Sequence, residues 1–253
     1  MPRSMHGGRH ELGQNFLTHR PTIEHITDLV RLTTGPILEL GAGDGALTRP
    51  LATLHRPLTV IDIDEHRVAR LRDRLPHVRV ERADALQHPL DAPVIVGNIP
   101  FHLTTPVLRR LLAARGWHRA VLLTQWEVAR KRAGVGGGTM MTAQSAPWFE
   151  FELCGRVAAH HFSPRPAVDG GLLSITRRGS SLVAHAERRA YENFVRGVFT
   201  GRGTGLASIA ARVTRVGIPV AKRALIKAGI DQRGLPRDLT ARQWAALWHG
   251  LRS

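Results

Sequence analysis

The strongest constraint on the fold is an alternation, between residues 34 and 176, of short apolar runs with stretches of helical period. Seven runs have the length and composition of strands: residues 36–40, 58–63, 78–83, 93–98, 119–126, 151–157 and 171–176. Amphipathic stretches that predict helices lie between the early runs, at residues 45–54, 65–75 and 105–114. This alternation predicts an α/β fold with a mainly parallel sheet. Only a proline-rich loop joins the last two runs, which predicts an antiparallel hairpin at the sheet edge.

The pattern changes after Arg178, because strand-like runs stop there. Four helical stretches follow, separated by Gly and Pro, at residues 186–199, 206–213, 219–230 and 240–251. We therefore expect an α/β domain over residues 1–178 and a small all-helical domain over residues 179–253. Between Asn193 and Ile230 the chain has seven basic residues and no acidic one.

The charge of the chain narrows the class of partner. Lys and Arg number 36 against 20 Asp and Glu, a formal net charge of +16, which favours a polyanion such as nucleic acid. The single cysteine, Cys154, excludes an internal disulfide and a cysteine-based zinc cluster, and we expect no metal. No apolar run is long enough to span a membrane, and the first residues lack the apolar core of a signal peptide. We expect a cytoplasmic protein that does not bind membranes, with a monomer as the default.

A glycine-rich turn between a strand and a helix, in the segment LELGAGDGALT at residues 38–48, indicates a nucleotide cofactor. The dinucleotide fingerprint that it loosely satisfies is weak evidence alone. Glu39 lies at the strand end, where a dinucleotide site usually has an apolar residue, and Asp44 inside the turn would repel a pyrophosphate. Both acids suit a ligand with cationic groups. S-adenosylmethionine, with its sulfonium and amino groups, is such a ligand.

Acidic residues end the next two strands, at the edge where the cofactor is expected. Asp62 is placed to hold ribose hydroxyls, and Asp84 to accept a hydrogen bond from the exocyclic amine of adenine. Each could instead cap the helix that follows it. Because three consecutive strands end in an acid or a glycine turn, we favour ligand binding over helix capping for these acids.

The tetrapeptide Asn98-Ile99-Pro100-Phe101 follows the fourth strand. The exocyclic amine of adenine is a poor nucleophile, because its lone pair is delocalised into the ring. An Asn side-chain oxygen and the main-chain carbonyl of Ile99 or Pro100 can accept its two hydrogens, while Pro100 stiffens the turn and Phe101 stacks on the base. A target base must be unpaired or extruded to reach such a site. The alternative is an ordinary turn, since Asn-x-Pro is common in loops.

These segments occur in an order that resembles the rRNA adenine dimethyltransferase superfamily, and within it most closely the Erm methyltransferases of macrolide–lincosamide–streptogramin B resistance. The resemblance rests on residues 13–17 (GQNFL), 39–45 (ELGAGDG), Asp62, Asp84, 98–101 (NIPF), and Phe162 with 164–166 (PRP). It covers nearly the whole chain and includes residues 125–153, which are similar to the enzymes of actinomycetes. It implies a Rossmann-like S-adenosylmethionine-dependent methyltransferase sheet with a small helical C-terminal domain. It also implies methylation of one adenine of 23S rRNA near the peptidyl-transferase centre, before subunit assembly is complete.

The resemblance also implies roles for individual residues. Asn15 and Leu17 match a segment that covers the cofactor, and Phe162 matches an aromatic residue that sandwiches the flipped adenine with Phe101; core packing is the alternative for Phe162. The candidate catalytic residues are Asn98, Phe101 and Phe162. The candidate cofactor residues are Asn15, Leu17, Glu39, Gly41, Gly43, Asp62, Ile63, Asp84, Ala85 and Asn98. Candidates for phosphate contacts are Arg109, Arg110, Arg130, Lys131 and Arg132, for which a solvated helix face is the alternative. The glycine-rich residues 134–138 predict a mobile loop facing RNA.

Three other functions stay open. A 16S rRNA dimethyltransferase of the same superfamily typically has Leu before the proline and Tyr after it, so NIPF favours the Erm enzymes. A non-catalytic RNA-binding relative would not need the intact set of cofactor residues. A dehydrogenase would leave the positive charge unexplained, and the sequence has no clear acid–base pair for hydride transfer.

Overall fold

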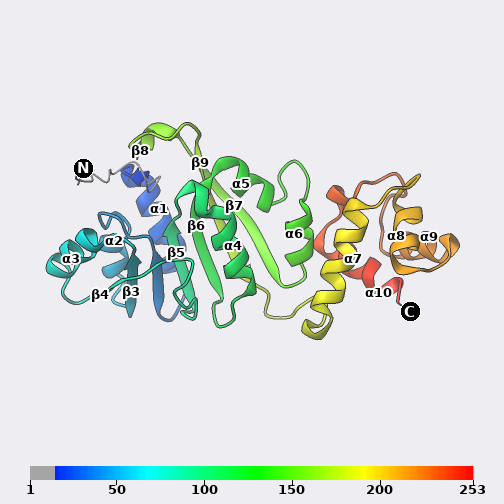
Figure 1. The fold of residues 1–253 in the computed structure, drawn as a ribbon, viewed down its shortest axis with the longest axis horizontal. Coiled ribbons are helices and arrows are strands. Elements are labelled where there is room, and N and C mark those ends of the chain that lie inside the picture. Colours follow the sequence, from blue (N-terminus) through cyan, green and yellow to red (C-terminus); the bar gives the residue numbers. More distant parts are fainter. Residues whose placement is uncertain (1–14, 253) are drawn as a thin grey trace, which may run out of the picture. The chain divides into compact units, whose positions relative to one another are not determined.

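The structure is a computed structural model that describes residues 15–252. Seven strands form one sheet in the order β4-β3-β2-β5-β6-β9-β7 (Figure 1). The strands are β2 (Ile37–Leu40), β3 (Leu58–Asp62), β4 (Arg79–Arg82), β5 (Val94–Asn98), β6 (Arg119–Gln125), β7 (Phe149–Val157) and β9 (Gly170–Arg177). The pairs β2–β3, β3–β4, β2–β5 and β5–β6 are parallel. Each strand lies where the apolar runs predict one, which confirms the α/β fold, and β9 and β7 are neighbours at the sheet edge.

Helices follow the strands as expected in the first part of the chain. They are α2 (Thr48–Ala52), α3 (Glu65–Arg74) and α4 (Thr104–Ala113), followed by α5 (Trp126–Arg132) and α6 (Met140–Ser145). The C-terminal helices are α7 (Arg188–Thr200), α8 (Leu206–Thr214), α9 (Ile218–Lys227) and α10 (Ala241–Gly250). The described residues after 178 contain no strand, as the sequence predicts. Helix α1 (Arg20–Arg31), α5 and α6 were not expected.

A second sheet of two very short strands was also not expected. Strand β1 (Phe16–Leu17) pairs antiparallel with β8 (Phe162–Ser163), so Leu17 lies opposite Phe162. The amide and the hydroxyl of Thr18 both donate to the carbonyl of His161, each at 2.9 Å, and extend this pairing. Residues 13 and 14 of the GQNFL segment, and the N-terminal region considered as a signal peptide, lie outside the described residues.

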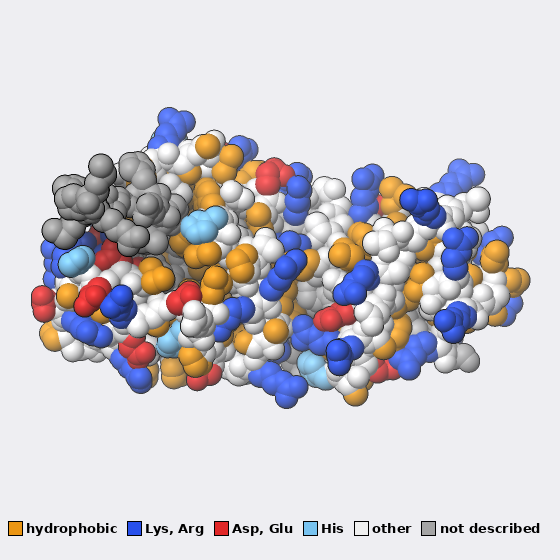
Figure 2. Space-filling view, viewed as in Figure 1, with side chains coloured by type: hydrophobic (Ala, Val, Ile, Leu, Met, Phe, Trp, Pro, Cys, Tyr) orange, Lys and Arg blue, Asp and Glu red, His pale blue; other side chains and the backbone are white. Residues whose placement is uncertain are grey.

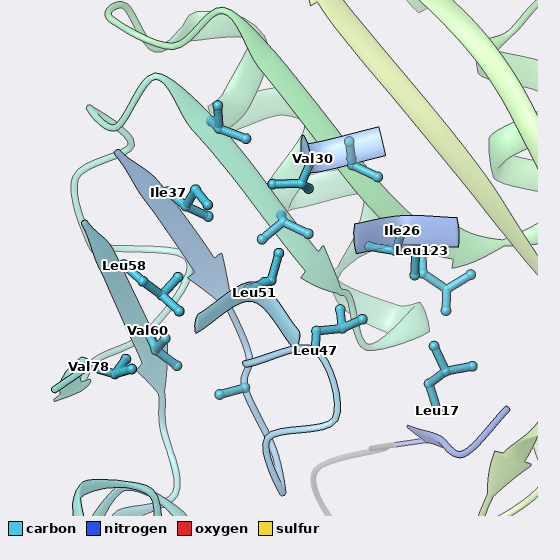
Figure 3. Close-up of a cluster of buried hydrophobic side chains, with 14 of the residues drawn as sticks. Leu17, Ile26, Val30, Ile37, Leu47, Leu51, Leu58, Val60, Val78 and Leu123 are labelled. Atoms are coloured by element: carbon cyan, nitrogen blue, oxygen red, sulfur yellow. The ribbon is translucent and has the colours of Figure 1, made fainter. Parts of the chain in front are cut away.

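The main core lies between one face of the sheet and helices α1, α2 and α3. Ile26 and Val30 of α1 and Leu51 of α2 are at most 1% exposed and point toward the strands (Figure 3). Alternate residues such as Ile95 and Leu122 point to the opposite face and are equally buried. A sheet buried on both faces explains the nearly continuous apolar runs in the sequence. Among the described residues, no helix has the length and apolar character needed to cross a membrane.

Backbone contacts divide the chain into two compact units, residues 1–129 with 152–175, and residues 130–151 with 176–253. Residues 130–151 therefore group with the C-terminal helices, which differs from the expected division at residue 178. The reason is a set of buried polar and aromatic contacts within the second unit. Tyr191 Oη donates to the carbonyl of Ala143 at 3.0 Å, and Trp148 Nε1 donates to the carbonyl of Val183 at 3.0 Å.

Candidate active site

Three cavities meet at Gly41, where β2 ends, and all are lined by residues of the first unit. The largest, of about 580 Å³, is lined by Leu17, Glu39 and Gly41 among others. A small cavity beside it is lined by Asn15, Gly43, Asp62 and the residues 98–101. The third, of about 70 Å³, is lined by Asp62, Ile63, Asp84 and Ala85. All ten residues named from the sequence as cofactor contacts thus line one of three adjoining cavities.

The N-terminal strand approaches the glycine-rich turn so closely that the turn needs a glycine at position 43. Gly43 has φ +56°, and a Cβ on it would lie 2.8 Å from a ring carbon of Phe16. The Gly43 amide donates to Asp62 Oδ2 at 2.7 Å, while Asp62 Oδ1 accepts from the Asp64 amide at 2.9 Å. Asp62 therefore fixes the turn in addition to facing the cavity.

Glu39 is a buried acid in the wall of the largest cavity, and it is 1% exposed. Among the described residues, its Oε2 atom has no hydrogen-bond partner. Burial raises the pKa of Glu39 to about 8, against the opposing effect of the nearby Thr48 hydroxyl and with a smaller contribution from the Asp62 carboxylate. A buried carboxylate oxygen without a partner is costly, and a cationic ligand group would compensate it.

The tetrapeptide at the end of β5 faces the small cavity. Asn98 Nδ2 donates to the carbonyl of Asn15 at 2.8 Å, which orients the side-chain amide. The Pro100 carbonyl accepts from the Leu103 amide at 2.8 Å in the short helix η1 (Phe101–Leu103), and this favours Ile99 as the main-chain acceptor for a substrate amine. The Phe101 and Phe162 rings are edge to face, with centroids 6.2 Å apart.

Phe162 is much less accessible than an aromatic residue that stacks on a base would be. Its ring is 4% exposed, and a Cβ on Gly170 would lie 2.9 Å from its ζ carbon. Packing is therefore part of its role, and its contact with a flipped base stays a prediction.

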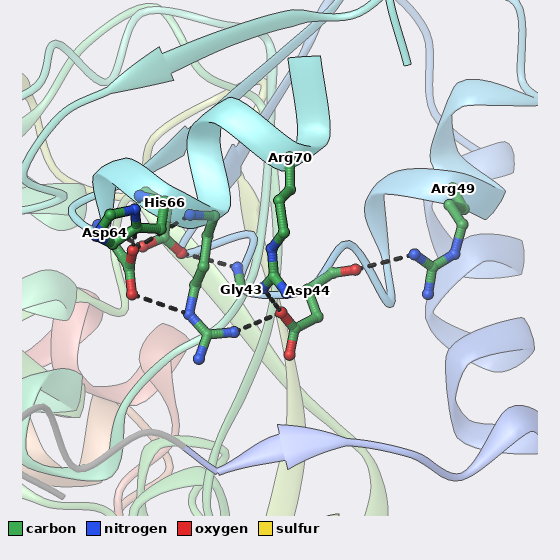
Figure 4. Close-up of polar contacts among 8 residues, drawn as sticks. Gly43, Asp44, Arg49, Asp64, His66 and Arg70 are labelled. Carbon is green, nitrogen blue, oxygen red and sulfur yellow. Dashed lines mark hydrogen bonds and ion pairs between the residues drawn. The ribbon is translucent and has the colours of Figure 1, made fainter. Parts of the chain in front are cut away.

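A cluster of charged residues surrounds Asp44 of the turn, and the sequence singled out Asp44 but not the two arginines that bind it (Figure 4). Arg67 of α3 bridges Asp44 at 2.7 Å and Asp64 at 3.2 Å, and its guanidinium lies 4.3 Å from the centre of the Phe16 ring. Arg70 binds Asp44 at 2.6 Å. Phe16 lines two of the cavities, and only its place in the GQNFL segment could have identified it.

The five cations named as phosphate contacts differ in their surroundings. Arg109 and Lys131 are exposed, whereas Arg110, Arg130 and Arg132 are half-buried. Arg130 donates to the carbonyl of Val135, and Arg132 donates to Thr139 Oγ1. The glycine-rich loop is held to the short helix η4 (Pro236–Asp238), because the Gly138 amide donates to the Arg237 carbonyl at 2.6 Å. That this loop moves and faces RNA stays a prediction.

The family described as ribosomal RNA adenine dimethylase matches residues 5–249. The chain belongs to the ribosomal RNA adenine dimethylase family. It is 49% identical over 246 residues to the mycinamicin-resistance protein MyrB of Micromonospora griseorubida, covering 96% of this chain and 78% of that protein. It is 51% identical over 209 residues to an rRNA adenine N-6-methyltransferase of Corynebacterium diphtheriae, covering 81% and 83% of the two chains.

Among solved structures, the 23S rRNA methyltransferase ErmE superposes with a TM-score of 0.86 at 32% identity, covering 94% of this chain and all of that one. Membership of the ribosomal RNA adenine dimethylase family confirms the predicted methyltransferase fold and the resemblance to Erm enzymes.

Proposed function

We propose that this protein transfers a methyl group from S-adenosylmethionine to the exocyclic amine of one adenine in the peptidyl-transferase region of 23S rRNA. The consequence would be resistance to macrolide, lincosamide and streptogramin B antibiotics. The observation that carries the proposal is the meeting of three cavities at Gly41, with residues of the tetrapeptide 98–101 in the wall of each of them. The name of the relative MyrB, a mycinamicin-resistance protein, supports the resistance, and the name of the 23S rRNA methyltransferase ErmE supports the substrate.

S-adenosylmethionine fits the residues that are present. The unpartnered Glu39 Oε2 suits a cationic amino group, Asp62 keeps lone pairs for ribose hydroxyls, and Asp84 lines the cavity at the far end, where adenine would lie. When bound, this cofactor supplies an electrophilic methyl group on a sulfonium centre.

The chain itself supplies orientation rather than acid–base chemistry. The Asn98 side-chain oxygen and the Ile99 carbonyl would accept the two amine hydrogens, which turns the nitrogen lone pair toward the methyl group. Phe101 would hold the plane of the base by stacking. No general base is required, because the nitrogen becomes cationic on transfer and its proton leaves afterwards.

The RNA would be held by cations outside these cavities. We propose four of the cations named from the sequence as phosphate contacts: Arg109, Arg130, Lys131 and Arg132. Contact with a long ribosomal RNA agrees with the net charge of +16. We also propose that the protein is cytoplasmic and monomeric and that it acts before subunit assembly is complete.

The test is methylation of protein-free 23S or 16S rRNA with labelled S-adenosylmethionine, followed by primer extension. We expect a stop at a single adenine in the peptidyl-transferase loop of 23S rRNA, and mass analysis of that nucleotide separates one methyl group from two. Label in 16S rRNA would instead assign the protein to the small-subunit enzymes. Absence of label in both RNAs, with the cofactor bound, would favour a non-catalytic RNA-binding protein.

A further inference from the structure

The turn at the adenine end of the cofactor site is tied to the sheet at its first residue, where the Ala83 amide donates to the Asp62 carbonyl at 2.9 Å. It follows the end of β4, spans residues 83–88, and supplies Ala83, Asp84 and Ala85 to the cavity of about 70 Å³. Its internal bonds are local: Asp84 Oδ1 accepts from the Leu86 amide at 2.7 Å, and the Asp84 carbonyl accepts from the amides of Gln87 and His88, each at 2.9 Å. These bonds shape the turn but do not fix its distance from the opposite wall of the cavity.

Arg110 of α4 supplies that connection. Its guanidinium donates through one terminal nitrogen to the Ala85 carbonyl and through the other to the His88 carbonyl, the latter at 2.9 Å. The side chain is half-buried, unlike its exposed neighbour Arg109. A planar guanidinium can hold two separate carbonyls in fixed directions, whereas a lysine ammonium offers one nitrogen on a flexible stem.

The helix that carries Arg110 also forms the opposite wall of the cavity. Leu103, at the end of η1, and Val107 line it, and Arg110 lies on the same side of α4 by helical spacing. The helix begins directly after the tetrapeptide of residues 98–101. Arg110 therefore ties the turn that would contact adenine to the helix that follows the catalytic segment.

We propose that Arg110 is a positioning residue for the adenosine end of the cofactor, and not a phosphate contact for RNA. By holding two carbonyls of the turn, it sets the separation between Asp84 and the wall formed by α4. The proposal rests on the proposed use of S-adenosylmethionine, and it replaces for this one residue the role expected from the sequence.

The first test is binding of S-adenosylhomocysteine to the full-length protein without RNA, by titration calorimetry. We expect Arg110→Ala to weaken binding about ten- to a hundredfold, and Arg110→Lys to recover part of the loss. Arg109→Ala is the matched control, because within residues 15–252 this exposed neighbour forms no hydrogen bond or ion pair with the turn. The affinity of this variant for S-adenosylhomocysteine should equal that of the wild type. Thermal unfolding of each variant establishes that it is folded at the temperature of the titration.

The second test separates positioning from a general loss of structure. S-inosylhomocysteine has a carbonyl in place of the adenine amine, so the wild type should prefer S-adenosylhomocysteine. We expect Arg110→Ala to lose most of this preference, because Asp84 is no longer held at the correct distance. Equal weakening of both ligands would overturn the proposal, and so would wild-type affinity combined with a higher KM for RNA. Failure of the wild type to bind S-adenosylhomocysteine would reject the proposed function itself.

Discussion

At the scale of single residues, Glu39 links the cofactor site to the stability of the empty protein. Its carboxyl keeps a proton up to a pH of about 8 in the folded chain, whereas the unfolded chain releases it near pH 4.5. The folded state therefore binds more protons within this window, and stability falls as the pH rises through it. The loss of stability at high pH results from the burial of a carboxyl group in a site that suits a cationic ligand.

The variant Glu39→Gln should abolish this component of the pH dependence. Without cofactor, we expect the melting temperature of the wild type to fall by about 8–15 °C relative to Glu39→Gln between pH 5 and pH 8.5. Differential scanning calorimetry across this range measures the difference. Parallel curves for the two proteins would mean that Glu39 titrates normally in the folded state.

Asn98 allows a test of catalysis that leaves binding nearly intact. We expect Asn98→Ala to lower single-turnover methyl transfer by about a hundred- to a thousandfold, because the amine loses a fixed hydrogen-bond acceptor. Cofactor affinity should stay within a few-fold of the wild type. Unchanged turnover in Asn98→Ala would refute the catalytic role.

At the scale of elements, strand β1 lies over the cofactor cavities and is held there by Arg67 of α3. Arg67 is 12% exposed, bridges two aspartates and stacks on Phe16, so its guanidinium joins the strand to the glycine-rich turn. We expect Arg67→Met to raise the KM for S-adenosylmethionine several-fold and to speed amide hydrogen exchange in residues 15–19.

The matched control for Arg67 is Arg70→Met. Arg70 binds the same Asp44, but its side chain is 55% exposed and the Phe16 contact belongs to Arg67. Exchange in residues 15–19 of this variant should match the wild type. Equal acceleration in both variants would attribute the effect to Asp44 rather than to the contact with Phe16.

Strand β8 carries Phe162, whose burial changes how its role must be tested. Truncation to Ala would leave a cavity and cost about 3–5 kcal/mol of stability, which would obscure any effect on RNA. Phe162→Leu preserves most of the packing while it removes the aromatic face. We expect this variant to reduce turnover on RNA more than cofactor affinity, as measured by steady-state kinetics and titration calorimetry. An equal reduction of both would assign Phe162 to packing alone.

The elements that the sequence predicts best are those with a strong period and a clear end. Strands β2, β3 and β4 end at or just before a glycine or an acid, and β5 ends at Asn98. These strand ends located Gly41, Asp62 and Asn98 at one edge of the sheet. Strands β1 and β8 have two residues each, too few to show a period. The partners of Arg110 lie 25 and 22 residues away in the chain, so its inward orientation depends on tertiary structure.

At the scale of the whole molecule, the positive charge is unevenly compensated. Arginines of the first unit such as Arg20, Arg67 and Arg82 form ion pairs. The seven cations between residues 193 and 230 are all exposed, and none forms an ion pair within residues 15–252. In Figure 2, Lys and Arg side chains are scattered over α8 and α9 without acidic neighbours on the visible face.

If these cations contact RNA phosphates, affinity should fall steeply with salt. We expect the logarithm of the RNA dissociation constant to rise linearly with the logarithm of salt concentration. Replacing Lys222, Arg223 and Lys227 of α9 by Gln should reduce that slope by about 2–3 and leave cofactor affinity unchanged. Filter binding at several salt concentrations measures the slope. The same slope in the triple variant and the wild type would mean that these three side chains of α9 do not contact RNA phosphates.

The pairing of β1 with β8 also has a consequence for biosynthesis. The two strands are separated by almost the whole catalytic region, and β9, which lies inside the large sheet, is made later still. A chain emerging from the ribosome at about 5–20 residues per second can form β2 to β6 early, but it cannot pair β1 until β8 has emerged. Newly made chains therefore pass through a stage in which the strand-end carboxylates are in place while β1 is held by Arg67 and Asn98 but still lacks β8, so we expect full retention of the cofactor only after β8 has been made.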